Sequence, residues 1–229
     1  MSTKYIASNW RLPNQENSSK NDNYGLTFNG SNEYIDSNFI IPAITEYSFS
    51  VWFKTASTPS GSSFILGDGN SAGQTKSGRA GIGFYNDFFL AGMGDNSNYW
   101  YDLSSYNISS VYDNNWHHLV LTINLYTQKL YVDGSLVQTY NTSSGGGGGS
   151  SSVPAGTIGA RNYVIGRYGD ATGTEFDGDI DEVAIWNKVL SADDIITIYN
   201  STNDNPGKCA NLFTGGLGSG LIYWNRMGD

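Results

Sequence analysis

Several features that assign chains to common classes are missing from this sequence. The 229 residues include one cysteine, Cys209, so no disulfide can form within the chain and the fold cannot depend on oxidation. Only 14% of the residues are charged, and no run of Lys and Arg occurs. Because phosphate binding needs clustered basic residues, the net charge of −9 argues against nucleic acid as a partner. No segment approaches the roughly 20 apolar residues of a membrane helix, so no membrane insertion is expected.

The sequence is rich instead in aromatic residues and glycine. Aromatic residues make up 14% of the chain, and 29 residues are glycine, a combination that suits short strands joined by long loops. Residues 47–55, YSFSVWFKT, alternate between apolar and mostly polar positions, which predicts a strand with one buried face. Similar patterns predict strands at 24–28, 33–36, 63–68, 80–85, 88–92, 116–124, 163–167, 176–186 and 221–224.

Two local signals predict a tight hairpin and a helix. Residues 130–140 form the hairpin, because Asp133-Gly134 tolerates the positive φ angles of a type I′ turn. Residues 191–199 form the one convincing helix, with Ser191 as its cap and two acidic residues in its first turn.

The chain is expected to fold as one domain with an arm. Residues 1–23 are polar and predicted to be an N-terminal arm that packs on its own domain or on a neighbour, with a disordered tail as the alternative. Residues 24–229 are expected to form a single β-sandwich domain. Residues 141–160 include five consecutive glycines, which cannot pack a core. Because the patterns on both sides suit one sandwich, this segment is predicted to be a surface loop.

A family resemblance rests on five segments in a fixed order. They are FNGSNEYID (28–36), FSVWFK (49–54), NNWHHLVLTI (114–123), LYVDGSLV (130–137) and FDGDIDEVAIWNKVLSADDI (176–195). Over about residues 24–200 the chain resembles laminin-G-like and pentraxin domains of the concanavalin A-like type. The resemblance implies an all-β fold, a jelly-roll sandwich of two antiparallel sheets with one short helix near the C-terminus.

The two ends of the chain suggest a viral setting. The arm and the closing segment LIYWNRMGD (221–229) resemble laminin-G-like proteins of marine tailed bacteriophages. The start of the chain has no apolar stretch of signal-peptide length, which is compatible with release by host lysis. The resemblance implies a place in a virion, as a capsid decoration, fibre or spike that contacts other virion proteins or copies of itself.

Catalysis is not expected from the acidic run at 179–182. Glycoside hydrolases of the concanavalin type place carboxylates at alternate strand positions facing one cleft. Asp179 and Asp181 share a face, but the next residue expected on that face is Val183, so the third carboxylate is missing. His117 and His118 are neighbours on one strand and point to opposite faces, so they cannot form one metal site together. The chain is therefore predicted not to be an enzyme.

Calcium and a glycan are the two ligands that the loops suggest. Calcium prefers oxygen ligands on loops, and no cofactor is required by any motif, so calcium stays an open alternative. The candidate ligands are Asp68, Asn70, Asp95 and Asp170. Aromatic faces beside amides suit a sugar or a protein surface, and the candidate contacts are Asn96, Asn98, Tyr99, Trp100 and Tyr101. Solvated turns and core packing of Trp100 are the plainer alternatives.

These observations predict a non-enzymatic structural or adhesion module of a virus particle. The alternative is a calcium-dependent lectin-like module that binds carbohydrate, and the protein would then be extracellular if it is not viral. Cell-surface glycans are possible partners of either. A glycoside hydrolase is the third and least favoured reading.

Overall fold

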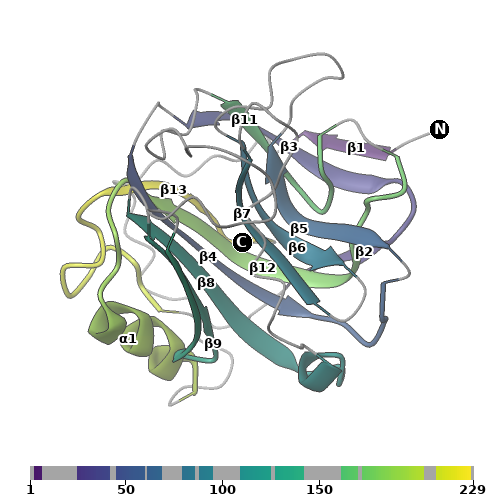
Figure 1. The fold of residues 1–229 in the computed structure, drawn as a ribbon. Coiled ribbons are helices and arrows are strands. Elements are labelled where there is room, and N and C mark those ends of the chain that lie inside the picture. The colour runs from purple at the N-terminus through teal and green to yellow at the C-terminus, as the bar shows by residue number, and fades with distance from the viewer. Residues whose placement is uncertain are drawn as a thin grey trace.

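The structure is a computed structural model of the whole chain. It describes residues 3–6, 25–41, 45–59, 61–68, 79–85, 88–94, 109–124, 127–141, 161–169, 172–203 and 210–227. Within these ranges the chain forms two β-sheets packed face to face and one α-helix (Figure 1). No helix in the described ranges is long and apolar enough to cross a membrane.

The first sheet has six strands and draws on both halves of the chain. Its strands, in spatial order, are β1 (Thr3–Ile6), β3 (Glu33–Ile41), β11 (Arg161–Ile165), β5 (Ser62–Asp68), β6 (Arg79–Tyr85) and β7 (Phe88–Gly94). All of these pairs are antiparallel except β1 with β3. The strand β1 lies inside the predicted N-terminal arm, so this part of the arm pairs with the edge of its own sheet.

The second sheet also mixes early and late strands. Its order is β10 (Ser135–Asn141), β9 (Thr127–Val132), β8 (Trp116–Asn124), β4 (Glu46–Lys54), β12 (Asp177–Trp186) and β13 (Leu221–Asn225), and β2 (Leu26–Asn29) pairs with the first part of β12. Every pair is antiparallel. A short 3₁₀ turn, η1 (Ser109–Val111), precedes β8. The predicted jelly-roll sandwich is therefore confirmed.

The core lies between the two sheets and follows the predicted alternation. The apolar face of β4 is fully buried there, and its four residues are Tyr47, Phe49, Val51 and Phe53. Opposing side chains come from the first sheet, among them Ile65, Ile82, Phe84, Tyr163 and Ile165. Burying one such side chain stabilises the fold by about 1.5–3 kcal/mol.

A second apolar layer covers the outer face of the second sheet. The helix α1 (Ala192–Asn203) lies against this face (Figure 1), where Ile195 and Ile198 pack near Trp186. The helix begins as predicted, because Ser191 Oγ accepts a hydrogen bond from the Asp194 N–H at 3.1 Å and Asp194 Oδ2 accepts one from the Ser191 N–H at 3.0 Å.

The predicted hairpin is confirmed in detail. Asp133 and Gly134 both have positive φ, at 49° and 75°, and they join β9 to β10 as the sequence requires.

One prediction of side-chain direction is wrong. A β-bulge interrupts the pairing of β12 with β4 between Asp181 and Ala184, and Glu182 within it has φ of 51°. The extra residue shifts the alternation by one, so Val183 points into the core between the sheets instead of following Asp179 and Asp181 on the outer face.

Candidate functional site

One end of the sandwich holds a pocket of about 280 Å³. Three connections that cross between the sheets contribute to it: residues 30–32 after β2, residues 55–59 and 61 between β4 and β5, and residues 172–176 before β12. Small-ligand pockets begin at about 300 Å³, so a molecule the size of one sugar ring suits this space. We call it the rim pocket, and its described lining residues are Asn29, Gly30, Thr55, Ser57, Thr58, Pro59, Gly61, Ser62, Ser63, Phe84, Gly173, Glu175, Phe176 and Asp177.

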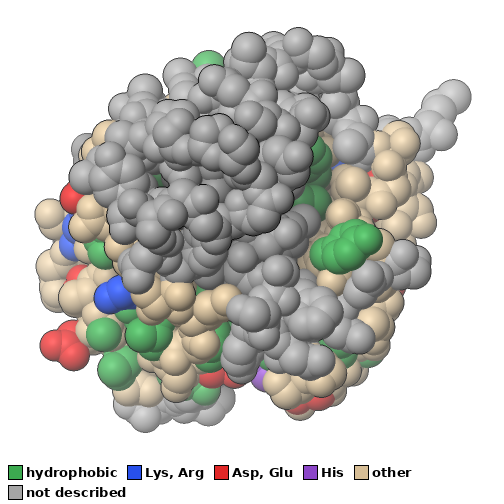
Figure 2. Space-filling model, in the orientation of Figure 1, with side chains coloured by type: hydrophobic (Ala, Val, Ile, Leu, Met, Phe, Trp, Pro, Cys, Tyr) green, Lys and Arg blue, Asp and Glu red, His purple; other side chains and the backbone are tan. Residues whose placement is uncertain are grey.

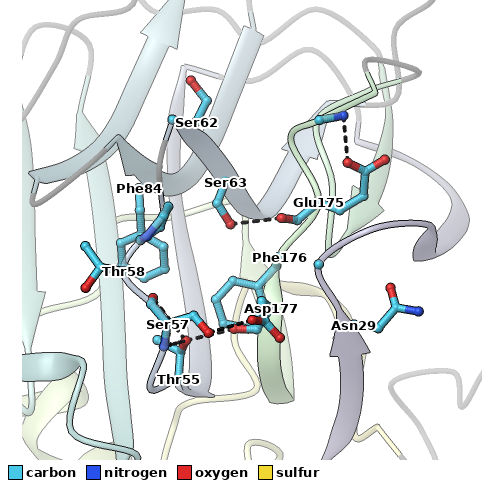
Figure 3. A pocket seen from close by; sticks show the side chains of 14 residues that line it. Asn29, Thr55, Ser57, Thr58, Ser62, Ser63, Phe84, Glu175, Phe176 and Asp177 are labelled. Carbon is cyan, nitrogen blue, oxygen red and sulfur yellow. Dashed lines mark hydrogen bonds between the residues drawn. The ribbon is translucent and has the colours of Figure 1, made fainter.

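Hydrogen bonds hold both carboxyl groups of the rim pocket in place (Figure 3). Ser57 Oγ donates to Asp177 Oδ2 at 2.5 Å, and Thr55 Oγ1 donates to the Asp177 carbonyl at 2.8 Å. On the other wall, the Gly173 N–H donates to Glu175 Oε2 at 2.7 Å. Because the groups are already ordered, a ligand that uses them loses less free energy to ordering on binding.

Two aromatic rings form the apolar base of the rim pocket. The rings of Phe84 and Phe176 are stacked with centroids 6.1 Å apart, and both are buried. Backbone hydrogen bonds fix Phe176 from both sides: its carbonyl accepts from the Gly30 N–H at 3.0 Å, and its N–H donates to the Gly166 carbonyl at 2.9 Å. The pocket thus has a rigid apolar base beneath a polar mouth.

The mouth is built from groups that recognise hydroxyl-rich molecules. Asn29, Thr58 and Asp177 are exposed there, and Ser57 is partly exposed. Hydroxyl groups both donate and accept hydrogen bonds, and carboxylates accept them strongly from a ligand O–H. Charged side chains are sparse on the described part of the face in Figure 2 as well, where most atoms belong to uncharged polar side chains and backbone.

The glycan and calcium residues predicted from the sequence lie almost entirely outside the described residues. This holds for all five candidate contacts, Asn96, Asn98, Tyr99, Trp100 and Tyr101, and for the candidate ligands Asn70, Asp95 and Asp170. Asp68 ends β5, but its side chain is outside the described part. Within the described part, no group of three or more His, Cys, Asp or Glu is placed to hold a metal ion. Calcium binding stays a prediction.

The acidic run on β12 is occupied by internal contacts. Asp179 lies 3.3 Å from Lys54 Nζ and accepts a hydrogen bond from Thr27 Oγ1 at 2.7 Å. Asp181 is fully buried, and its Oδ1 accepts a hydrogen bond from the Glu182 N–H at 2.8 Å. A buried carboxyl group cannot reach a polysaccharide in solvent, so this pair does not form the open cleft that a glycoside hydrolase needs.

The two histidines point to opposite faces, as predicted. His117 contacts Asp133 and Asp113 at the end of the core side, with Nδ1 2.7 Å from the Asp133 carboxylate. His118 is fully buried on the outer face and stacks on Trp52 with centroids 4.9 Å apart. Burial lowers the pKa of His118 to about 3, so it is a neutral, structural side chain.

Sequence reasoning did not find the residues of the rim pocket. Ser57 and Asp177 are 120 positions apart; Asp177 stands in one of the segments that carry the family resemblance, but nothing in that segment links it to Ser57. They meet because β12 runs antiparallel to β4 with Asp179 opposite Lys54, so the start of β12 and the segment after β4 lie at the same end of the sandwich. Only the register of these two strands could have predicted the contact.

Comparisons with known proteins agree with this fold. The sequence profile of the concanavalin A-like lectin/glucanases superfamily matches residues 16–196. A comparison with curated protein sequences found no match. The structure resembles the CBM40 domain of a Ruminococcus gnavus sialidase at a TM-score of 0.57 and 16% identity, covering 78% of this chain and 96% of that one.

Two further solved structures share the fold at low identity. A heptameric pentraxin from Limulus polyphemus matches with a TM-score of 0.55 and 15% identity, over 76% of this chain and 80% of that one. Domain 4 of an extracellular arabinanase from Geobacillus stearothermophilus matches with a TM-score of 0.50 and 17% identity, over 77% and 83%. At identities this low, the structural matches are evidence of a shared fold only. The match to the family profile, by contrast, covers most of the sequence. The chain belongs to the concanavalin A-like lectin/glucanases superfamily.

Proposed function

We propose that this domain is a non-enzymatic carbohydrate-binding module that holds a sugar in the rim pocket. The observation that carries the proposal is the pocket itself, in which Ser57 and Asp177 present hydrogen-bonding groups on a wall supported by the buried rings of Phe84 and Phe176. Sugars present many hydroxyl groups that donate and accept hydrogen bonds, and the pocket mouth offers partners for them.

Two of the similar structures add support from their ligands. The CBM40 domain was solved with α2,3-sialyllactose bound, and domain 4 of the arabinanase was solved in complex with arabinotriose. The first is a domain of a sialidase and the second a domain of an arabinanase, and the match covers 96% and 83% of those two chains. A sandwich of this kind can therefore serve as a sugar-binding module, although the site must be argued from its own residues.

The test is a glycan array followed by titration calorimetry on the best ligand. Ser57→Ala removes the hydroxyl that holds Asp177, and we expect it to weaken binding about tenfold, the effect of roughly one hydrogen bond. Gly61→Trp adds a large side chain to the pocket wall at a position where a Cβ meets no atom within 4 Å, and we expect it to obstruct the pocket and abolish binding.

The matched control is Thr27→Ala. Thr27 donates to Asp179 as Ser57 does to Asp177, at 2.7 Å, but outside the rim pocket. The Thr27→Ala variant should therefore bind the sugar with the same affinity as the wild type. Binding that survives Gly61→Trp, or that falls equally with Thr27→Ala and Ser57→Ala, would place any sugar site elsewhere.

The sequence also predicts that the protein is part of a virus particle, which concerns its location and not its ligand. An adhesion protein of a particle needs a receptor on the cell surface, and a glycan can be one, so the two roles are compatible. What supports the particle role is the resemblance of the arm and of residues 221–229 to phage proteins. Quantitative mass spectrometry of purified particles tests it, since absence of the protein from them would remove the virion role and leave the sugar-binding module.

A further inference from the structure

The ionisable side chains among the described lining residues of the rim pocket are all acidic. Glu175 and Asp177 are the two ionisable side chains among its described lining residues, which include no Lys, Arg or His. Glu175 is buried at 8% exposure, whereas Asp177 lies at the exposed mouth. A ligand in the pocket therefore meets acidic groups both on its inner wall and at its entrance.

Two described basic side chains near the pocket in sequence, Lys54 and Arg167, are engaged by other groups. Lys54, next to Thr55 on the pocket wall, forms its ion pair with Asp179 at 3.3 Å. Arg167 donates from Nε to the Gly169 carbonyl at 2.8 Å, and its guanidinium lies over the Tyr34 ring at 3.8 Å. The net charge of −9 adds to the same field.

Such a pocket treats neutral and acidic sugars differently. The hydroxyl groups of a neutral sugar can donate to both carboxyl groups in charge-assisted hydrogen bonds. Among the described lining residues a sugar carboxylate finds no cation to pair with, and it faces like charges where water is partly excluded.

We infer that the rim pocket selects uncharged sugars and rejects sugars that carry a carboxylate, such as sialic and uronic acids. The inference rests on the proposed function, because it specifies the ligand of the same site. It also sets this module apart from the CBM40 domain, which was solved with a sialylated sugar.

The experiment compares sugars that differ in a carboxylate, by calorimetry or by NMR titration. Suitable pairs are methyl galactoside with methyl galacturonoside, and galactotriose with trigalacturonate, in which carboxylates replace hydroxymethyl groups. For the wild type we expect the neutral member to bind at least about tenfold more tightly than its acidic partner. The difference should widen when salt is lowered, because screening of the pocket carboxylates is reduced.

Two variants at Gly61 add or withhold a positive charge without removing any contact. Gly61→Lys places an ammonium group where a new side chain meets open space, and Gly61→Gln is a neutral side chain of similar length. Relative to Gly61→Gln, Gly61→Lys should reduce the preference for the neutral sugar about tenfold. Asp177→Asn should act in the same direction, because it removes one charge while its amide oxygen still accepts from Ser57.

The outcomes separate the inference from the proposed function. If an acidic sugar binds as tightly as its neutral partner, and this binding is lost in Gly61→Trp, the site exists and the inference is wrong. If no sugar of either kind binds in a manner sensitive to Gly61→Trp and Ser57→Ala, the proposed function is wrong and the inference goes with it.

Discussion

His117 is held between two carboxylates from different segments. Its Nδ1 donates to Asp133 Oδ2 at 2.7 Å, and its Nε2 donates to Asp113 Oδ1 at 3.1 Å. Ionised carboxylates only accept hydrogen bonds, so the arrangement is complete when both ring nitrogens carry protons. The hydrogen bond that His117 donates to Asp133 raises the pKa of His117, although partial burial acts in the opposite direction. The cluster ties the β9–β10 turn to the segment before β8.

These contacts predict a pH-dependent contribution to stability. Because the pKa of His117 is raised in the folded state, its contribution is complete below the unfolded value of 6.5 and is lost as the pH rises through the folded pKa. Hydrogen bonds from Asn115, and then from His117, lower the pKa of Asp113 to about 2, so its contribution is lost as the pH falls from 3.8 towards that value.

The difference in melting temperature between wild type and His117→Gln should therefore be largest between pH 3.8 and 6.5. It should shrink at alkaline pH and in strong acid. Thermal melts of both proteins from pH 3 to pH 9 measure it. An equal difference at every pH would show that the side chain acts by packing and not by its charge.

Glu182 combines a buried charge with an unfavourable backbone angle. Its Oε2 accepts from Trp224 Nε1 at 2.5 Å, its Oε1 accepts from Arg226 Nε at 3.2 Å, and its φ is 51°. Glu182→Ala should cost about 3 kcal/mol or more, because Arg226 keeps a buried charge without this partner. Glu182→Gly loses the same contacts but relieves the left-handed backbone, so it should be about 1 kcal/mol more stable than Glu182→Ala.

Urea unfolding of the two variants measures this difference. In an ordinary strand the opposite result is expected, because a protein with glycine there is less stable than one with alanine by about 0.5–1 kcal/mol. Alanine proving the better replacement for Glu182 would mean that the bulge relaxes when the ion pair is removed.

At the scale of elements, the N-terminal cap of α1 is the clearest local feature that the sequence predicts and the structure contains. Ser191→Ala removes the acceptor of the Asp194 N–H and should lower the free energy of unfolding by about 1 kcal/mol. Ser191→Asn keeps a capping oxygen and should stay within about 0.5 kcal/mol of wild type. Urea unfolding at constant m-value gives both numbers. Equal losses in the two variants would indicate that the hydroxyl acts outside the cap.

Elements with one buried face were predictable, and irregular ones were not. The bounds predicted for β8, residues 116–124, are those observed, because alternation alone places Leu119, Leu121 and Ile123 in the core. On β12 strict alternation gave the wrong face for Val183, because two successive acidic residues carry no sign of a bulge. The strand β1 was not predicted, since four residues in a polar arm are too few for a period to appear.

The candidate site was harder to predict than the fold for a related reason. A strand can be recognised from the alternation of apolar and polar residues in the local sequence. The rim pocket, by contrast, is lined by three connections that are far apart along the chain. Serine, threonine and glycine in those connections look like any other turn residues. Their meeting depends on how strands cross between sheets, which is a property of the whole sandwich.

At the scale of the molecule, each sheet is completed by strands from both sides of the glycine-rich segment. The strand β11 lies between β3 and β5 in the first sheet, and β12 lies between β4 and β13 in the second. Residues before 141 therefore lack a central strand of each sheet. The two parts of the chain are expected to fold only together, as one cooperative unit.

A protease site inserted after Gly147 tests this interdependence. After cleavage the two fragments should co-elute in native gel filtration and separate in concentrated guanidinium chloride, because β11 and β12 are held by hydrogen bonds on both edges. Unfolding of the cleaved protein becomes a dissociation, so its melting temperature should rise with protein concentration, while that of the intact chain should not. Residues 1–141 expressed alone should fail to give a cooperative melt. If instead that fragment melts cooperatively, or the cleaved fragments separate in native buffer, the chain contains two independent units and the glycine-rich segment is a linker between them.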